Sequence, residues 1–253
     1  MTVSSLFRPR TISVTGTQLP VSPIGLPYVV FDALRGTEAI NELFEYELTL
    51  KSRDEYSAGV LGEAFSAAAA MAGGAPGSNW SLQSIIASSM TVHIQQDGKV
   101  DLSDLGFGVD IGRMVSGLVP AAAGAGVRHI NGIVSRAAYA GVVGRHARYT
   151  ITLRPWLWLL SKTSDYRIYQ HQSVIDIIDT VLKKYPFPFE TRYAQSYPIL
   201  DFQVQYGETD LAFVQRLMQE YGLNLHFEHS NGQHTLVLSD YNSLHRTRGG
   251  CFI

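Results

Sequence analysis

The residues with the clearest chemical potential lie in one short stretch near the end of the chain. Four side chains there could bind a metal ion: His226, Glu228, His229 and His234. They surround an Asn-Gly pair at 231–232, which between alternating apolar residues predicts a β-hairpin. That hairpin places His229 opposite His234 on one face, and His226 and Glu228 on the other. Because neither face collects three ligands, we predict a cross-strand histidine pair and no metal site.

Other candidates for chemistry are weaker. Cys251 needs a histidine base held by the fold, yet it lies in the terminal string RTRGGCFI. Two pairs of carboxylates are better explained as the wet faces of a helix and a strand: Asp176 with Asp179, and Glu45 with Glu47. The sequence has no phosphate loop, H-E-x-x-H helix or G-x-S-x-G elbow, and GFGVDIG at 106–112 has its third glycine one place too late. We therefore predict no catalytic residue, no cofactor and no enzyme activity.

The string RPWLWLL at 154–160 has three interpretations: a membrane plug, a ligand-stacking surface, or buried packing. Its apolar part is far shorter than the ~18 to 20 residues that a spanning helix needs. Leucines alternate with Trp156 and Trp158, which favours packing. We expect both rings to anchor a junction between two parts of the fold, with an indole N–H bonded to a carbonyl. A stacking surface remains the alternative.

Composition and charge exclude several classes of protein. Lys and Arg number 20 against 22 Asp and Glu, a formal charge of −2, and neither sign forms long runs, so we expect no nucleic-acid partner. A single cysteine allows no internal disulfide. The opening MTVSSLFRPR lacks the apolar core of a signal peptide. We expect the protein to be made in the cytoplasm, to leave it by another route if at all, and not to insert stably into a membrane.

Alternation of apolar and polar residues predicts an antiparallel sheet or barrel in the first part of the chain. The pattern runs through 44–51 and 149–153, and HINGIVS at 129–135 gives a third strand. Between them, residues 57–126 contain Ala/Gly-rich strings with few side chains large enough to build a core. We interpret 57–126 as an insertion that carries one strand-like segment, 90–100, with an Asp-Gly turn at 97–98.

Helical periodicity appears only in the second part. Residues 173–185 predict an amphipathic helix capped by Ser173 and Asp176 and stopped by Pro186. Residues 208–221 predict a second helix, which Gly222 ends in the left-handed conformation. With the hairpin that follows, these elements indicate an α+β fold that is mainly antiparallel β. We expect a barrel-like first domain at 1–155 and a partial α+β domain at 156–253.

Five collinear segments of the chain resemble one family, the VgrG spike proteins of type VI secretion, also called Rhs-element Vgr proteins. The segments are 43–54 (LFEYELTLKSRD), 130–135 (INGIVS), 149–178 (YTITLRPWLWLLSKTSDYRIYQHQSVIDII), 196–229 (SYPILDFQVQYGETDLAFVQRLMQEYGLNLHFEH) and 234–240 (HTLVLSD). Together they cover well over half of the chain. The first part of this family is similar to a phage baseplate hub.

The resemblance implies a structural role. Three copies would form the hollow base of a membrane-puncturing spike on a tube of Hcp rings. This assembly would form in the cytoplasm and then be secreted through the type VI system with effectors. Its partners would be itself as a homotrimer, the Hcp tube, and effector or adaptor proteins. The family pattern continues into a second barrel, an OB-fold and a β-helical needle that this sequence does not contain, and its strands nearly adjoin where this chain has 57–126.

Three alternatives to the spike base stay open. The first is a contractile phage tail hub, which these residues hardly distinguish from the secretion spike. The second is a truncated adaptor or effector-docking module that uses the segment 57–126 and does not form the spike. The third is an enzyme effector, which would need a convergent polar pocket at the 226–234 hairpin or in the insertion.

Overall fold

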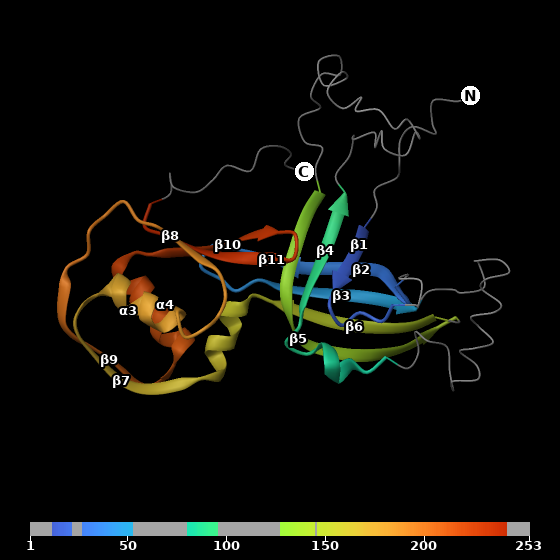
Figure 1. Cartoon of the computed structure of the whole chain (residues 1–253), viewed down its shortest axis with the longest axis horizontal. Helices are drawn as coiled ribbons and strands as arrows, with labels where there is room; N and C mark the ends of the chain where they lie inside the picture. Colours follow the sequence, from blue (N-terminus) through green and yellow to red (C-terminus); the bar gives the residue numbers. More distant parts are fainter. Residues whose placement is uncertain (1–11, 22–26, 53–79, 96–126, 145, 242–253) are drawn as a thin grey trace, which may run out of the picture.

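The chain folds around two sheets and a two-stranded ribbon (Figure 1). The structure, a computed structural model, describes residues 12–21, 27–52, 80–95, 127–144 and 146–241. The Ala/Gly-rich strings, the predicted turn at 97–98 and Cys251 lie outside the described residues. No helix in the described ranges is long and apolar enough to cross a membrane.

The first part of the chain forms a six-stranded antiparallel sheet. Its strands are β1 (Ile12–Gly16), β2 (Val29–Thr37), β3 (Glu45–Ser52), β4 (Ser89–Gln95), β5 (Val127–Val143) and β6 (His146–Arg154). They are hydrogen-bonded in the order β1-β4-β5-β6-β3-β2, and the two edge strands β1 and β2 contact one another. The alternation that predicted β3 and β6 is confirmed, since Leu48, Leu50, Ile151 and Leu153 are fully buried.

The segment predicted as an insertion is not wholly external to this sheet. Strand β4 lies within 57–126, yet it is hydrogen-bonded to β1 on one side and to β5 on the other. Val92 is fully buried in the core, and the short 3-10 helix η3 (Leu82–Ile85) buries Ile85. At least residues 82–95 therefore belong to the core of the fold.

The second part begins with the 3-10 helix η5 (Trp156–Lys162) and is built from two helices and five strands. The elements are β7 (Ser164–Ser173), α3 (Val174–Leu182), β8 (Phe189–Arg192), β9 (Ile199–Thr209), α4 (Asp210–Tyr221), β10 (Asn224–Ser230) and β11 (Gln233–Ser239). The order in the second sheet is β10-β11-β8, with β8 parallel to β11, while β7 and β9 form an antiparallel ribbon. Figure 1 shows this ribbon at the edge of the molecule, outside the two helices.

Both predicted helices are confirmed, but α3 ends at Leu182, three residues before the predicted end at Tyr185. Ser173 and Asp176 form a reciprocal capping box at the start of α3. The Thr209 hydroxyl accepts a hydrogen bond from the Ala212 N–H at the start of α4, and Gly222 ends that helix at a φ of 69°. The predicted fold class, α+β and mainly antiparallel β, is confirmed. Strands β7 and β9 are the main elements that the sequence analysis did not predict.

Candidate functional site

The histidine hairpin is where the structure joins its two sheets. As predicted, His229 of β10 is paired with His234 of β11 across the two-residue turn. Both imidazoles point toward the first sheet and meet Asn131 of β5. The backbone N–H of Asn131 donates to Nδ1 of His229 at 3.1 Å, and Nδ1–H of His234 donates to the side-chain amide oxygen Oδ1 of Asn131 at 2.7 Å. The pair is therefore an inter-sheet junction, which the pattern of strands alone did not reveal.

A second backbone donor completes this junction. The N–H of Trp156, at the start of η5, donates to Nε2 of His234 at 2.8 Å. Both ring nitrogens of His234 are thus used in its neutral form, with the proton on Nδ1. Burial, and then the neighbouring His229, lower the pKa of His234 to about 3. His234 is consequently neutral near pH 7 and acts as a structural connector.

The other face of the hairpin is occupied by ion pairs. Glu228 accepts a hydrogen bond from Arg192 of β8 at 2.8 Å, and Arg192 also bonds to Glu190. Nε2 of His226 lies 3.8 Å from the Glu228 carboxylate. Across the described part of the chain, no three His, Cys, Asp or Glu residues come together as metal ligands. The four predicted candidates thus lie on two separate surfaces with different partners.

The pairs of carboxylates serve local structure. Asp176 belongs to the capping box of α3, and Asp179 forms an ion pair with Lys183 at 2.9 Å. Glu45 forms an ion pair with Arg154 across the neighbouring strands. Glu47 is exposed on β3. Within these pairs, nothing brings two carboxylates to a common reacting point.

The tryptophan segment is only partly as predicted. Trp156 is fully buried, stacks on Phe187 at 5.4 Å between ring centroids, and confirms the packing interpretation. Its indole N–H was predicted to bond to a carbonyl, and this is wrong: Nε1 is buried without a hydrogen-bond partner among the described residues. The ring is held by stacking, while the backbone N–H of the same residue makes the polar link to His234.

Trp158 differs from Trp156 and corrects the expectation that both rings lie in the core. Trp158 is only partly buried. The Lys162 ammonium lies 4.5 Å from its ring centroid and the Arg154 guanidinium 5.4 Å from it. The 3-10 turn of η5 explains the difference, because it directs Trp156 inward and leaves Trp158 at the surface between two cations.

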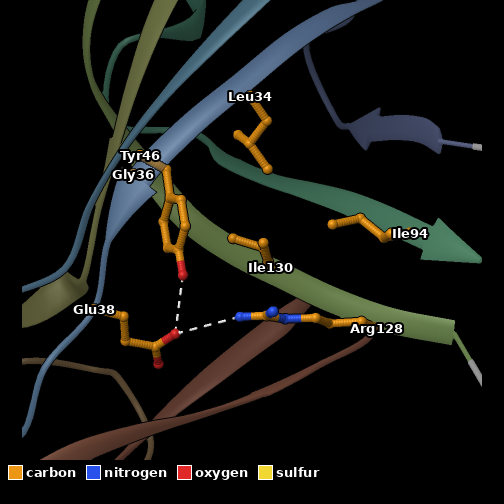
Figure 2. A pocket seen from close by; sticks show the side chains of 7 residues that line it. All are labelled: Leu34, Gly36, Glu38, Tyr46, Ile94, Arg128 and Ile130. Carbon is orange, nitrogen blue, oxygen red and sulfur yellow. Dashed lines mark hydrogen bonds and ion pairs between the residues drawn. The ribbon is translucent and has the colours of Figure 1, made fainter. Parts of the chain in front are cut away.

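A pocket opens on the first sheet between β2 and β3 on one side and β4 and β5 on the other (Figure 2). It has a volume of about 470 Å³ and is lined by Leu34, Gly36, Glu38, Tyr46, Ile94, Arg128 and Ile130. The Tyr46 ring lies so close to Gly36 that a Cβ there would come within 2.1 Å of Cδ1 of the ring. Glycine is therefore required at this wall of the pocket.

Among the described residues that line the pocket, Glu38 is the one carboxylate, and three donors surround it. The Tyr46 hydroxyl donates to Glu38 at 2.9 Å, the Arg128 guanidinium lies 3.8 Å away, and Nε2 of His229 lies 3.4 Å away. Burial raises the pKa of Glu38, but these partners outweigh it and hold the pKa below its usual range. Figure 2 shows the tyrosine and arginine links together. A carboxylate stabilised as an anion in this way is a poor general base at neutral pH.

The ribbon of β7 and β9 carries the largest group of exposed apolar side chains. Its members are Tyr166 (72% exposed), Ile168 (63%), Ile199 (72%), Phe202 (66%) and Tyr206 (79%). Strand pairing puts Tyr166 beside Tyr206, and Ile168 and Phe202 follow on the same face. The opposite face packs inward through Tyr169 and Gln205, both buried. The sequence analysis missed this surface. The alternation of Tyr166, Ile168, Phe202 and Tyr206 could have indicated two strands, but not which face stays exposed.

A second, smaller apolar group lies at the end of the β5–β6 hairpin. Tyr139, Val142 and Val143 are each more than half exposed there. Figure 1 shows this hairpin end on the opposite side of the molecule from the β7–β9 ribbon. Exposed patches of this kind mark contacts with other proteins more often than catalytic centres. The surfaces of this chain therefore favour assembly.

Comparison with known proteins gives one family and one fold. Residues 37–251 match the family described as phage tail baseplate hub (GPD). The type VI secretion system spike proteins VgrG1c and VgrG1b of Pseudomonas aeruginosa are 44% and 45% identical over 124 and 121 residues. These alignments cover 49% and 47% of this chain but 17% and 16% of the two relatives. The resemblance to VgrG proteins predicted from the sequence is confirmed.

Two solved structures share the fold. The E. coli c3393 protein is described as a component of the type VI secretion system with structural similarity to the T4 tail proteins gp27 and gp5. It aligns with a TM-score of 0.61 at 19% identity, over 94% of this chain and 51% of that protein. The lidless PdpA–VgrG complex aligns with a TM-score of 0.54 at 10% identity, over 93% of this chain and 36% of the matched chain. At these identities the likeness concerns the fold alone.

Proposed function

Because the chain belongs to the phage tail baseplate hub family, we propose that it is a structural subunit of a type VI secretion spike base. In this role three copies form a hub that caps the Hcp tube, is assembled in the cytoplasm, and leaves through the secretion system with effectors. The match to the family over residues 37–251 carries this proposal. The names of the curated relatives VgrG1c and VgrG1b favour the secretion spike among the members of the family.

The exposed ribbon supports an assembly role on physical grounds. A two-stranded ribbon buries one face against the helices, and nothing in the described chain covers the other face, which carries Tyr166, Ile168, Phe202 and Tyr206. The residues that alternate onto this face between Tyr166 and Gln170 and between Phe202 and Tyr206 are uncharged, so contact between copies there brings no like charges together. Aromatic enrichment with depletion of charge is the composition of an interface centre. We assign the ribbon to contact between copies.

A ring of three copies needs two different surfaces that meet head to tail. The ribbon and the β5–β6 hairpin end supply two apolar surfaces on opposite sides of the molecule (Figure 1). Two different surfaces allow head-to-tail contact, which forms a ring when the rotation between neighbouring copies closes and an open filament when it does not. The division into a first domain at 1–155 and a second at 156–253 remains part of this proposal, with one surface on each.

The test is the molar mass of the purified chain, measured by light scattering after size exclusion, with and without Hcp. A trimer or a complex with Hcp is the expected result. The Phe202→Lys variant should lose the assembly, because it places a charge at the centre of the ribbon. Tyr241→Lys is the matched control, since Tyr241 is an exposed aromatic residue outside the ribbon. A monomer that ignores Hcp would contradict the proposal.

A phage tail hub is the second candidate, favoured by the description of the matching family. The same measurement separates the two functions when a contractile-phage tube protein replaces Hcp. Binding of the phage tube protein without binding of Hcp would assign the chain to a tail. An adaptor or effector-docking role would show instead as a stable monomer.

A further inference from the structure

Two neighbouring strands of the first sheet hold a second pair of histidines. His93 of β4 lies directly opposite His129 of β5, and both are partly buried. Their Nδ1 atoms are 3.0 Å apart, with the rings nearly perpendicular at 86°. On the other side of β4, the Thr15 hydroxyl oxygen of β1 lies 2.7 Å from Nε2 of His93. Neither the assembly role nor the inter-sheet junction uses this cluster.

The two hydrogen bonds of His93 link its tautomer to the role of the Thr15 hydroxyl. If the Thr15 hydroxyl accepts the Nε2–H of His93, then Nδ1 of His93 is unprotonated. The 3.0 Å contact then contains one proton, which His129 donates from its Nδ1. Metal-binding histidines are commonly held by such a second partner, which fixes the ring and its tautomer. If the His129 proton moves from Nδ1 to Nε2, both Nδ1 lone pairs become available, and a divalent metal ion could bind them.

The distance between the two nitrogens selects among metals. With metal–nitrogen bonds of about 2.0 to 2.1 Å, ligands at 90° lie about 2.9 Å apart and ligands at a tetrahedral angle about 3.35 Å apart. The observed 3.0 Å is closer to the first value. Adjacent positions at 90° occur in the square-planar and octahedral sites of Cu²⁺ and Ni²⁺, whereas Zn²⁺ prefers a tetrahedron.

We propose that His93 and His129 form a two-imidazole chelate for Cu²⁺ or Ni²⁺, with Thr15 as a positioning residue and water in the remaining coordination positions. The site is independent of the proposed assembly role. Pairing in the sheet already fixes both strands, so binding requires little ordering of the backbone. The bound ion would join β4 to β5.

The test is calorimetric titration of the full chain, purified without a histidine tag, with NiCl₂. All proteins carry Cys251→Ser so that the thiol does not compete for metal. The original chain should bind one Ni²⁺, and H93Q and H129Q should each weaken binding at least tenfold. His171→Asn is the matched control, because His171 is exposed on β7 and removing it should leave binding unchanged. Thr15→Val should weaken Ni²⁺ binding by about 10-fold or more through loss of the positioning contact.

Two further readouts keep the proposal falsifiable. Metal-free unfolding in urea shows whether H93Q and H129Q still fold, so that lost binding is not mistaken for lost structure. Electron paramagnetic resonance of added Cu²⁺ should show coupling to two imidazole nitrogens, reduced to one or none in the variants. The proposal would be overturned by unchanged Ni²⁺ binding in H93Q and H129Q, by no binding at all, or by tighter binding of Zn²⁺ than of Ni²⁺.

Discussion

The inter-sheet junction and the β7–β9 ribbon differ in what they bury: the junction buries polar groups, whereas the ribbon exposes apolar ones. At the junction, His234 is buried and both its ring nitrogens are hydrogen-bonded. On the ribbon, Phe202 and Tyr206 stand in solvent although they are apolar or aromatic. Buried polar groups must be satisfied, so the junction holds one chain together. Exposed apolar groups gain from being covered, so the ribbon is suited to contact with another chain.

The largest effect should come from the core beside the junction. Trp156→Ala should lower the free energy of unfolding by about 3 to 5 kcal/mol, because it removes a fully buried ring stacked on Phe187. Denaturant unfolding followed by circular dichroism measures this change. An unchanged midpoint would show that the ring is not part of the core.

The junction should also weaken in acid. His234 has a folded pKa of about 3, below the ordinary histidine pKa of 6.5, so its contribution to stability is fully present above pH 6.5. That stability is lost as the pH falls from about 6.5 toward 3, by about 1.4 kcal/mol per pH unit. Between pH 7 and pH 5 the loss through this residue should be about 2 kcal/mol.

The measurement is urea unfolding of the original chain and of His234→Gln at pH 7 and pH 5. Other titrating groups act on both proteins, so only the difference between their pH dependences reports on His234. The variant should be less stable at pH 7 but less sensitive to pH. If the free energy of unfolding depends equally on pH in the two proteins, His234 does not contribute to the loss of stability in acid.

Replacing Trp158 should have an effect on stability between the effects expected at the junction and on the ribbon. Trp158→Ala should lower the free energy of unfolding by about 1 to 2 kcal/mol, because it removes a partly buried ring and its contacts with Lys162 and Arg154. Comparing its urea midpoint with that of Trp156→Ala sharpens the contrast between a core ring and a surface ring. A loss as large as that of Trp156→Ala would place Trp158 in the core.

The smallest effect on stability should come from the ribbon. Phe202→Lys should change the free energy of unfolding by no more than about 0.5 kcal/mol, because the side chain is 66% exposed. The same variant should abolish self-association in light scattering. Strong destabilisation measured on the monomer would mean that Phe202 packs within its own chain, and the contrast between the two regions would fail.

Local patterns were sufficient for most individual elements. The capping box of Ser173 and Asp176, the left-handed Gly222 and the Asn-Gly turn each act over a few residues, so the sequence predicted where α3, α4 and the β10–β11 hairpin begin or end. The predicted pairing of His229 with His234 was also correct, because a two-residue turn fixes the register. The resemblance to VgrG proteins came from long collinear segments and needed no structure.

Only the tertiary structure shows which elements contact one another and which side chains they leave exposed. Asn131 is 103 residues from His234 and Trp156 is 78 residues from it, and no local rule relates such positions. Alternation can suggest a strand at 199–209, but only packing shows that Phe202 faces solvent while Gln205 is buried. The inter-sheet junction, the ribbon surface and the His93–His129 contact therefore became visible only when distant strands were placed side by side.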